Sequence, residues 1–136
     1  MMKKKNKRQG FQPDPWNYGV FDNQINTGNV ITVDLKEYYD PQLLCLKIDE
    51  CAKLLQKGTV QVVVFIHGYG SHNTAALIHD RTRDYLKRKY GKFRIVAGED
   101  FNIFNEDARV LHTQYPELDI LLQVCNHGVT VVGNRK

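Results

Sequence analysis

The segment Val62–Ser71, which reads VVVFIHGYGS, constrains the fold more than any other part of this 136-residue chain. Its five apolar residues are mostly β-branched and too few for an independent helix, so they predict a buried strand. The strand leads into a glycine-containing turn, and Ser71 then begins a helical pattern. A turn of this kind directs backbone N–H groups and the positive end of a helix dipole toward one point. We therefore expect an anion site at the turn.

The residues before this segment predict a strand and a helix. Val30–Leu35 alternates in polarity and is rich in β-branched residues, as strands are. Asp40-Pro41 is a strong helix start, because aspartate caps helices and proline fits the first helical position. Apolar residues then recur at helical spacing, and Gly58 is well placed to end the helix. The residues expected on its buried face are Leu44, Ile48, Cys51, Ala52 and Leu55.

The residues after the segment predict a second long helix, which begins at Ser71 and ends near Tyr90, before Gly91. Phe93–Val96 is expected to be a third strand. The residues that mark the core side of the helix are Leu77, Ile78, Tyr85 and Leu86.

The last third of the chain predicts a short helix and a hairpin. Asn105 is placed to cap a helix that continues through His112 and ends before Pro116. Asp119–Val124 and Val129–Val132 flank a turn, which predicts two antiparallel strands.

This order of elements predicts a single two-layer α/β sandwich. We expect a mixed sheet of four to five strands with two main helices on one face, in residues 30–136. Residues 1–29 are expected to form a basic, flexible arm. The first strand–helix–strand step would be parallel and right-handed, which places the glycine turn where α/β sheets usually bind ligands.

The net charge of +4 belongs to the arm. Five of the 19 Lys and Arg residues lie in residues 3–8. The rest of the chain has 14 Lys and Arg against 15 Asp and Glu, so its net charge is about −1. A basic arm is typical of contact with nucleic acid or the ribosome, although a solvated segment that only aids solubility is the alternative.

The cysteines and the hydropathy pattern predict a cytoplasmic protein without membrane partners. No apolar run approaches the roughly 18 residues that a membrane span needs. The basic start lacks the apolar stretch of a secretory signal. Cys45, Cys51 and Cys125 form no CxxC pair and are expected to be free thiols.

His67 and Asp34 are the candidates for chemistry. Histidine serves as a general acid or base, or donates to a phosphate, but His67 could equally cap the strand end with one hydrogen bond. Asp34 ends the first strand beside it, where a carboxylate orients an imidazole, binds a divalent metal such as Mg²⁺, or simply forms a turn. The remaining histidines lack the spacing of a tight metal site.

The second helix carries a cationic face. Residues 80 to 94 include seven Lys and Arg residues but only two Asp. Such a surface either follows a phosphate backbone or is a solvated helix face whose cations complement the C-terminal end of the dipole. The candidates for phosphate contact are Arg81, Arg83, Lys87 and Arg88.

Three blocks of residues, in order and spacing, resemble the Smr (small MutS-related) domain family over roughly residues 30–132. They are Val33-Asp34-Leu35, the HGYG block with its preceding strand, and Gly128–Val132. The resemblance implies a two-layer α/β fold similar to the C-terminal domain of a bacterial translation initiation factor. It also implies binding to DNA, RNA or ribosomes, and in several members endonuclease activity that nicks or cleaves nucleic acid.

The chain departs from the family's first motif, Asp-Leu-His-Gly, which here reads Asp34-Leu35-Lys36-Glu37. The aspartate is present, but a lysine replaces the histidine, which weakens the case for a hydrolase and favours a binding domain. Under the resemblance, His67 and Asp34 would be catalytic. The residues expected to hold nucleic-acid phosphate at this site are Lys36, Gly68, Tyr69, Gly70 and Ser71.

Two other functions fit parts of the pattern. A non-catalytic adaptor that docks on a ribosome or a protein is consistent with the missing histidine. The run VVVFIHGYGS also looks like the oxyanion turn of an α/β-hydrolase, but the chain has no GxSxG nucleophile motif.

Overall fold

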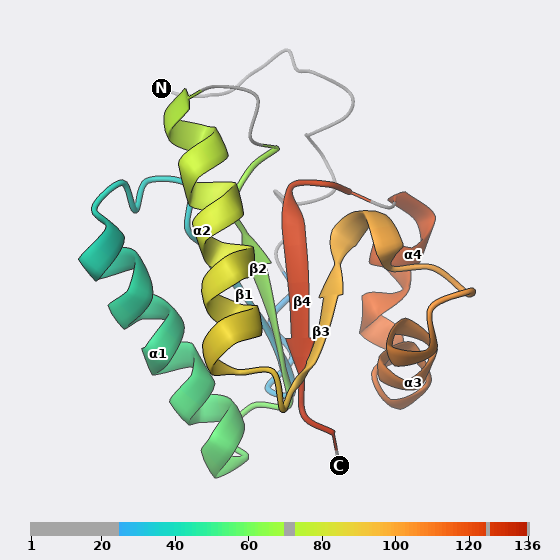
Figure 1. Ribbon diagram of the computed structural model, residues 1–136. Helices are drawn as coiled ribbons and strands as arrows, with labels where there is room; N and C mark the ends of the chain where they lie inside the picture. The colour runs from blue at the N-terminus through green and yellow to red at the C-terminus, as the bar shows by residue number, and fades with distance from the viewer. Residues whose placement is uncertain (1–24, 70–72, 125, 136) are drawn as a thin grey trace.

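A computed structural model describes residues 25–69, 73–124 and 126–135. Within these ranges the protein forms a mixed four-stranded sheet in the order β1-β2-β4-β3 (Figure 1). β1 is parallel to β2, whereas β4 is antiparallel to both of its neighbours. The strands are β1 (Val30–Asp34), β2 (Val62–Ile66), β3 (Arg94–Ala97) and β4 (Val129–Gly133).

The two long helices cover one face of the sheet, as the sequence predicts (Figure 1). α1 (Pro41–Lys57) begins with Asp40, whose carboxylate accepts from the Gln42 N–H at 2.8 Å, and it ends at Gly58 with φ 77°. All five apolar residues expected on its inner face are buried. α2 (Asn73–Lys89) packs beside α1 and buries Ile78 and Leu86. The predicted α/β sandwich is therefore confirmed.

The segment between β3 and β4 covers the opposite face of the sheet (Figure 1). Leu111, Leu118 and Leu121 are fully buried against Val64 and Val131 of the central strands. This second core leaves β2 and β4 buried on both faces, which agrees with their nearly continuous apolar sequences. The elements of the segment are η1 (Gly98–Asp100), α3 (Glu106–Gln114), η2 (Pro116–Leu118) and α4 (Asp119–Val124).

Two predictions about secondary structure and core packing are wrong. The segment Asp119–Val124 is a helix and not the first strand of a hairpin, because Leu118 and Leu121 reach the core at a helical spacing of three residues. Leu77 was expected in the core but is 48% exposed. It precedes Arg81 by four residues and so shares the solvent-facing side of α2 with it. The predicted helix capped by Asn105 is confirmed as α3, whose Ala108 N–H donates to the Asn105 side chain.

The predicted arm falls largely outside the described residues, which begin at Ile25. The described end of the arm folds back on β1. The Ile25 N–H donates to Thr32 Oγ1 at 3.0 Å, and the Thr27 hydroxyl donates to Glu117 at 2.5 Å. In this part of the chain no helix has both the length and the apolar character needed to cross a membrane.

Candidate functional site

Residues from the ends of the four strands meet at one edge of the sheet. β1 and β2 end there, β4 begins there, and β3 ends there because it is antiparallel to β4. The Leu35 N–H donates to the Ile66 carbonyl at 2.7 Å, which extends the pairing past β1. We call this region the strand-end edge; it consists of Asp34, Lys36, His67, Gly68, Glu99, His127 and Gly128.

Two glycines in close contact occupy the centre of the strand-end edge. A Cβ on Gly128 would lie 3.4 Å from the carbonyl carbon of Gly68 and 2.9 Å from Asn126 Oδ1. Gly68 has φ 87°, a conformation that glycine adopts without strain. The backbone N–H groups of His67 and Gly68 both donate to the Gly128 carbonyl, at 2.9 and 3.1 Å. These two N–H groups therefore bond to the protein's own backbone. The sequence predicted that N–H groups of this turn point at an anion, and for these two that prediction is wrong.

The rest of the predicted anion turn is described only in part. Tyr69 is half-buried. Gly70 and Ser71, expected to bind phosphate and to begin the second helix, lie outside the described residues, which resume at Asn73. Their role in phosphate binding stays a prediction.

His67 lies beneath the glycines and is only 1% exposed. Its Nδ1 is 2.9 Å from the Gly68 carbonyl oxygen, which only accepts, so Nδ1 carries the proton. Its Nε2 is 2.8 Å from Thr130 Oγ1 and accepts the hydroxyl proton. Burial lowers the pKa of His67 to about 3, and the positive charge of Arg83 acts in the same direction. Of the two roles that the sequence left open, this geometry favours the structural one.

Arg83, predicted to contact phosphate, is instead the centre of a partly buried hydrogen-bond network. Its Nε donates to Thr130 Oγ1 at 2.9 Å, and its two terminal nitrogens donate to Glu99 at 2.7 and 2.8 Å. It also donates to the backbone carbonyls of His127 and Val129. Partial burial alone would raise the pKa of Glu99, but the Arg83 hydrogen bonds outweigh it and lower that pKa to about 2. Arg83 thus connects α2, η1 and β4.

Asp34 and Lys36 lie at the exposed end of β1. The Lys36 N–H donates to Asp34 Oδ1 at 2.8 Å, and the Lys36 ammonium is 3.8 Å from the other carboxylate oxygen. Both side chains are about half exposed, at 45% and 55%. Lys36 Cγ lies 3.9 Å from the place where a Gly68 Cβ would stand. The structure thus brings two of the predicted site residues beside a third.

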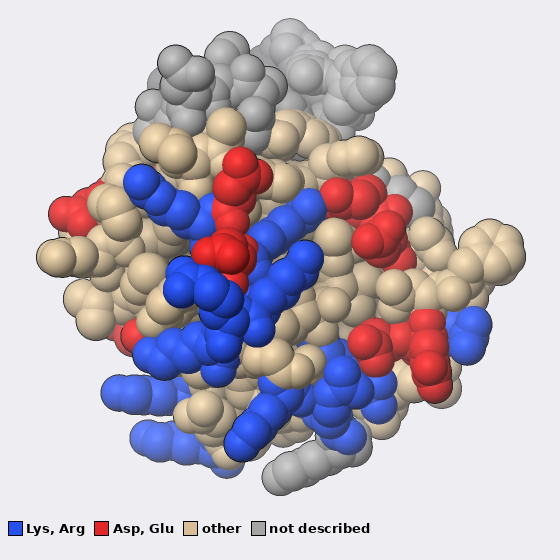
Figure 2. Space-filling view, viewed as in Figure 1, with Lys and Arg blue, Asp and Glu red and all other residues tan. Residues whose placement is uncertain are grey.

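The other predicted phosphate contacts lie on the solvent side of α2, where Lys and Arg side chains gather (Figure 2). Arg88 pairs with Asp84 at 2.8 Å. Arg81 and Lys87 are exposed and form no ion pair with any residue in the described ranges. We call these three cations, Arg81, Lys87 and Arg88, the α2 basic surface.

Acidic residues gather over a different part of the molecule. The segment 98–124, on the other face of the sheet, contains six Asp and Glu but a single Lys or Arg, Arg109. Figure 2 shows acidic side chains over this segment, beside the largely basic region of α2. The protein therefore has a basic and an acidic side.

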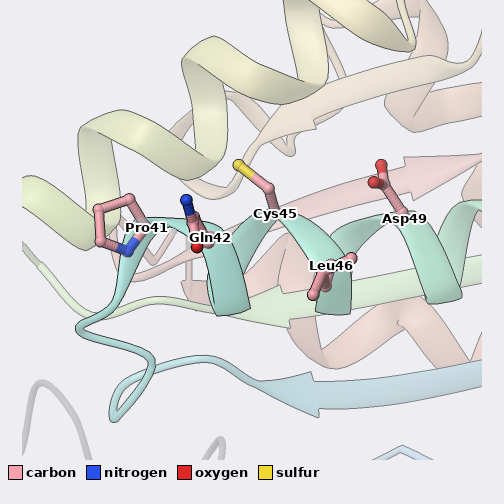
Figure 3. A pocket seen from close by; sticks show the side chains of 5 residues that line it. All are labelled: Pro41, Gln42, Cys45, Leu46 and Asp49. Atoms are coloured by element: carbon pink, nitrogen blue, oxygen red, sulfur yellow. The ribbon is translucent and has the colours of Figure 1, made fainter.

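A shallow groove of about 480 Å³ lies on α1. In Figure 3 the side chains of Cys45 and Asp49 extend from α1 toward α2. Burial raises the pKa of the Cys45 thiol, and Asp49 accepts hydrogen bonds from Tyr85 and Tyr90, so neither group is free for chemistry. The groove is lined by Pro41, Gln42, Cys45, Leu46 and Asp49.

The sequence pattern gives no direct signal for Glu99, Thr130 or His127 as members of the site. The sequence predicts that His127 lies in a turn and has no metal-ligand spacing, yet it is adjacent to Gly128, and its Nδ1 lies 3.9 Å from Glu99 Oε2. The sequence holds only an indirect signal for His127: it precedes Gly128, and the contact of Gly128 with Gly68 brings His127 to the same edge. Among the described residues, no group of three or more His, Cys, Asp or Glu is placed to hold a metal ion. A divalent metal beside Asp34 remains an untested expectation.

No family model matches the sequence, and comparison with curated proteins and with solved structures finds no match. The fold and the site thus define an α/β domain with a polar strand-end edge, and the Smr resemblance stays an expectation.

The low pKa of His67 predicts a loss of stability in mildly acidic buffer. The unfolded chain binds a proton near pH 6.5 and the folded chain only near pH 3, so the free energy of unfolding falls as the pH drops through this window. For one group the slope approaches about 1.4 kcal/mol per pH unit. Urea unfolding at about pH 7.5 and 4.5 should show a loss of roughly 2 kcal/mol more in the wild type than in His67→Gln. Equal losses would contradict this account.

Proposed function

We propose that this protein binds nucleic acid, with the α2 basic surface in contact with backbone phosphates. The observation that carries the proposal is the separation of charge: exposed cations on α2 and acidic residues on the segment 98–124. Phosphate contacts of this kind supply most of the sequence-independent affinity for nucleic acid. The resemblance to the Smr family supports the same function.

The charge separation also orients the complex. A polyanion is repelled by the side that carries Glu106 and Asp119 and attracted to the side that carries Arg81 and Lys87. The strand-end edge adjoins α2 through Arg83, which donates to the His127 carbonyl. Under the proposal, a nucleic-acid strand along α2 continues to this edge, where Lys36 lies against Gly68. One nucleic-acid strand would then contact both predicted sets of phosphate-binding residues.

The proposal is for binding and not for cleavage. His67 has both ring nitrogens engaged and is buried, so it offers no free nitrogen to a scissile phosphate. We place this binding in the cytosol. Cys45 and Cys51 are free thiols, which suits a reducing compartment.

A salt titration tests the proposal. The full chain should bind labelled single-stranded DNA or RNA, and the affinity should fall with salt along a log–log slope of about −2 to −4. Arg81→Gln and Lys87→Gln should each weaken binding and make the slope shallower by about 1, because each removes one phosphate contact. Fluorescence anisotropy at several salt concentrations gives both quantities.

Arg109→Gln is the matched control, because it removes the same charge from the acidic side of the molecule. It should leave the slope unchanged. Salt-independent or absent binding by the wild type would overturn the proposal, and so would an equal effect of the Arg109 change. Binding to ribosomes that persists after nuclease treatment would support the docking adaptor instead.

A further inference from the structure

The groove on α1 presents a largely apolar surface to solvent. Leu46 lines it and is 58% exposed, and the Pro41 ring and the Cys45 thiol line it as well (Figure 3). Burial raises the pKa of the Cys45 thiol, so this side chain is uncharged at neutral pH. The volume of the groove, about 480 Å³, lies within the range of sites for small organic groups.

Asp49 also lines the groove, but its negative charge is compensated. Its carboxylate accepts a hydrogen bond from the Tyr85 hydroxyl at 2.9 Å and another from the Tyr90 hydroxyl. The Lys89 ammonium lies 3.2 Å from the same carboxylate. Asp49 therefore joins α1 to α2 beside the groove and adds little net negative charge to it.

Two arginines of α2 border the groove. The Tyr85 hydroxyl contacts Asp49 of α1, so the side of α2 that carries Tyr85 faces α1. Arg81 precedes Tyr85 by four residues and Arg88 follows it by three, and residues at these spacings are neighbours on one side of a helix. Burial raises the pKa of the Cys45 thiol, and the positive charges of Arg88 and Arg81 act in the opposite direction. The apolar groove and these two cations are therefore adjacent.

The two arginines can exchange their present contacts for phosphate. Arg81 forms no ion pair with any residue in the described ranges. Arg88 pairs with Asp84, but the two side chains are 70% and 63% exposed, and such a pair is weak. Cations beside an apolar groove complement a nucleotide, which joins a charged phosphate to a flat, largely apolar base. Proteins that bind single strands combine basic residues that follow the backbone with side chains against which the bases pack.

We propose that the groove on α1 holds an unpaired base of the nucleic acid whose backbone contacts Arg81 and Arg88, so that the protein selects single strands over duplexes. The inference rests on the proposed function, because the same cations of α2 bind the phosphates. The bases of a duplex are paired and stacked inside it, so none of them enters the groove. A duplex also has the higher charge density, so a surface that bound phosphate alone would not prefer the single strand.

Fluorescence anisotropy at neutral pH with three labelled DNA oligonucleotides of equal length tests the inference. They are a single strand, its duplex, and a strand whose internal nucleotides are abasic. The wild type should bind the single strand about five- to tenfold more tightly than the other two, which is the contribution expected of one bound base. The abasic strand keeps its phosphates, so this comparison isolates the base. All three affinities should fall with salt, because phosphate contacts contribute to each.

Leu46→Gln should reduce the preference for the single strand to less than about twofold, because it removes the exposed apolar side chain of the groove. It should leave the salt dependence unchanged, because it removes no charge. Leu43→Gln is the matched control, since Leu43 is 55% exposed on the same helix but does not line the groove. It should keep the full preference. Unfolding midpoints check that both variants are folded.

The outcomes separate this inference from the proposed function. If the wild type binds all three oligonucleotides equally and with the expected salt dependence, the inference fails and the proposed function stands. The inference also fails if Leu46→Gln keeps the preference or if the two leucine variants behave alike. If the wild type binds none of the three at any salt concentration, both fail.

An acidic amphipathic peptide shares the two features of a nucleotide, negative charge beside an apolar surface. A labelled helical peptide of Glu and Leu is therefore the competing ligand. It should bind more weakly than the single strand. If it binds more tightly and Leu46→Gln weakens its binding, the groove is a docking site for acidic peptides and the inference is overturned.

Discussion

Replacement of Arg83 by methionine should lower the free energy of unfolding by about 3 kcal/mol, because it leaves a carboxylate partly buried without its partner. The Arg83 side chain is 15% exposed and Glu99 29%, so neither group is well solvated. The same change removes the hydrogen bond to Thr130 and the bonds to the carbonyls of His127 and Val129. α2, η1 and β4 would lose a common link. Urea unfolding at neutral pH measures the effect.

Two further variants separate this network from a general effect of charge. Arg88→Met removes an equally charged residue from an exposed pair with Asp84, and it should cost less than about 0.5 kcal/mol. Arg83→Met combined with Glu99→Gln should recover part of the loss, since the unpaired charge is gone. If Arg83→Met and Arg88→Met cost the same, the network does not stabilise the fold as described.

Gly98→Ala should be nearly as damaging, with an expected loss of about 3 kcal/mol or more from overpacking. A Cβ at Gly98 would stand 1.9 Å from the Asn126 carbonyl oxygen and 2.6 Å from Val129 Cγ2. Both neighbours belong to or adjoin β4, so relief of the clash requires the backbone to move. The turn that carries His127 would shift with it. Thermal or urea unfolding at neutral pH measures the loss of stability.

Gly28→Ala is the control for the effect of an added methyl group. No atom lies within 4 Å of the position of its Cβ, and its cost should come from φ 91° alone, about 1–2 kcal/mol. A Gly98→Ala variant as stable as Gly28→Ala would show that η1 and the turn before β4 are not in tight contact.

The sequence predicts best those helices and strands whose ends are marked by residues at the ends themselves. Asp40, Pro41 and Gly58 set the bounds of α1 through capping and backbone conformation, and the structure places all three as expected. Asp119–Val124 was misassigned because a six-residue apolar segment satisfies either period. Its helical form depends on the core on the second face of the sheet, which no local pattern reveals.

The candidate site was predictable only where residues lie at strand ends. Asp34 and His67 follow from strand boundaries, and the parallel pairing of β1 with β2 brings them to one edge. The buried environment of His67 depends on Thr130 and Arg83, which are 63 and 16 residues away along the chain. Contacts at such separations carry no sequence period, so the structural role of His67 and the place of His127 emerged only from the fold.

The position of β4 has a consequence for synthesis of the chain. β4 follows every other described strand in the sequence, yet it lies between β2 and β3. Until residues 129–133 leave the ribosome, the apolar β2 has one unpaired edge and β3 has no neighbour in the sheet. A nascent domain in this state exposes an edge that can pair with other chains. Release of β4 is therefore the step that closes the sheet and ends this exposure.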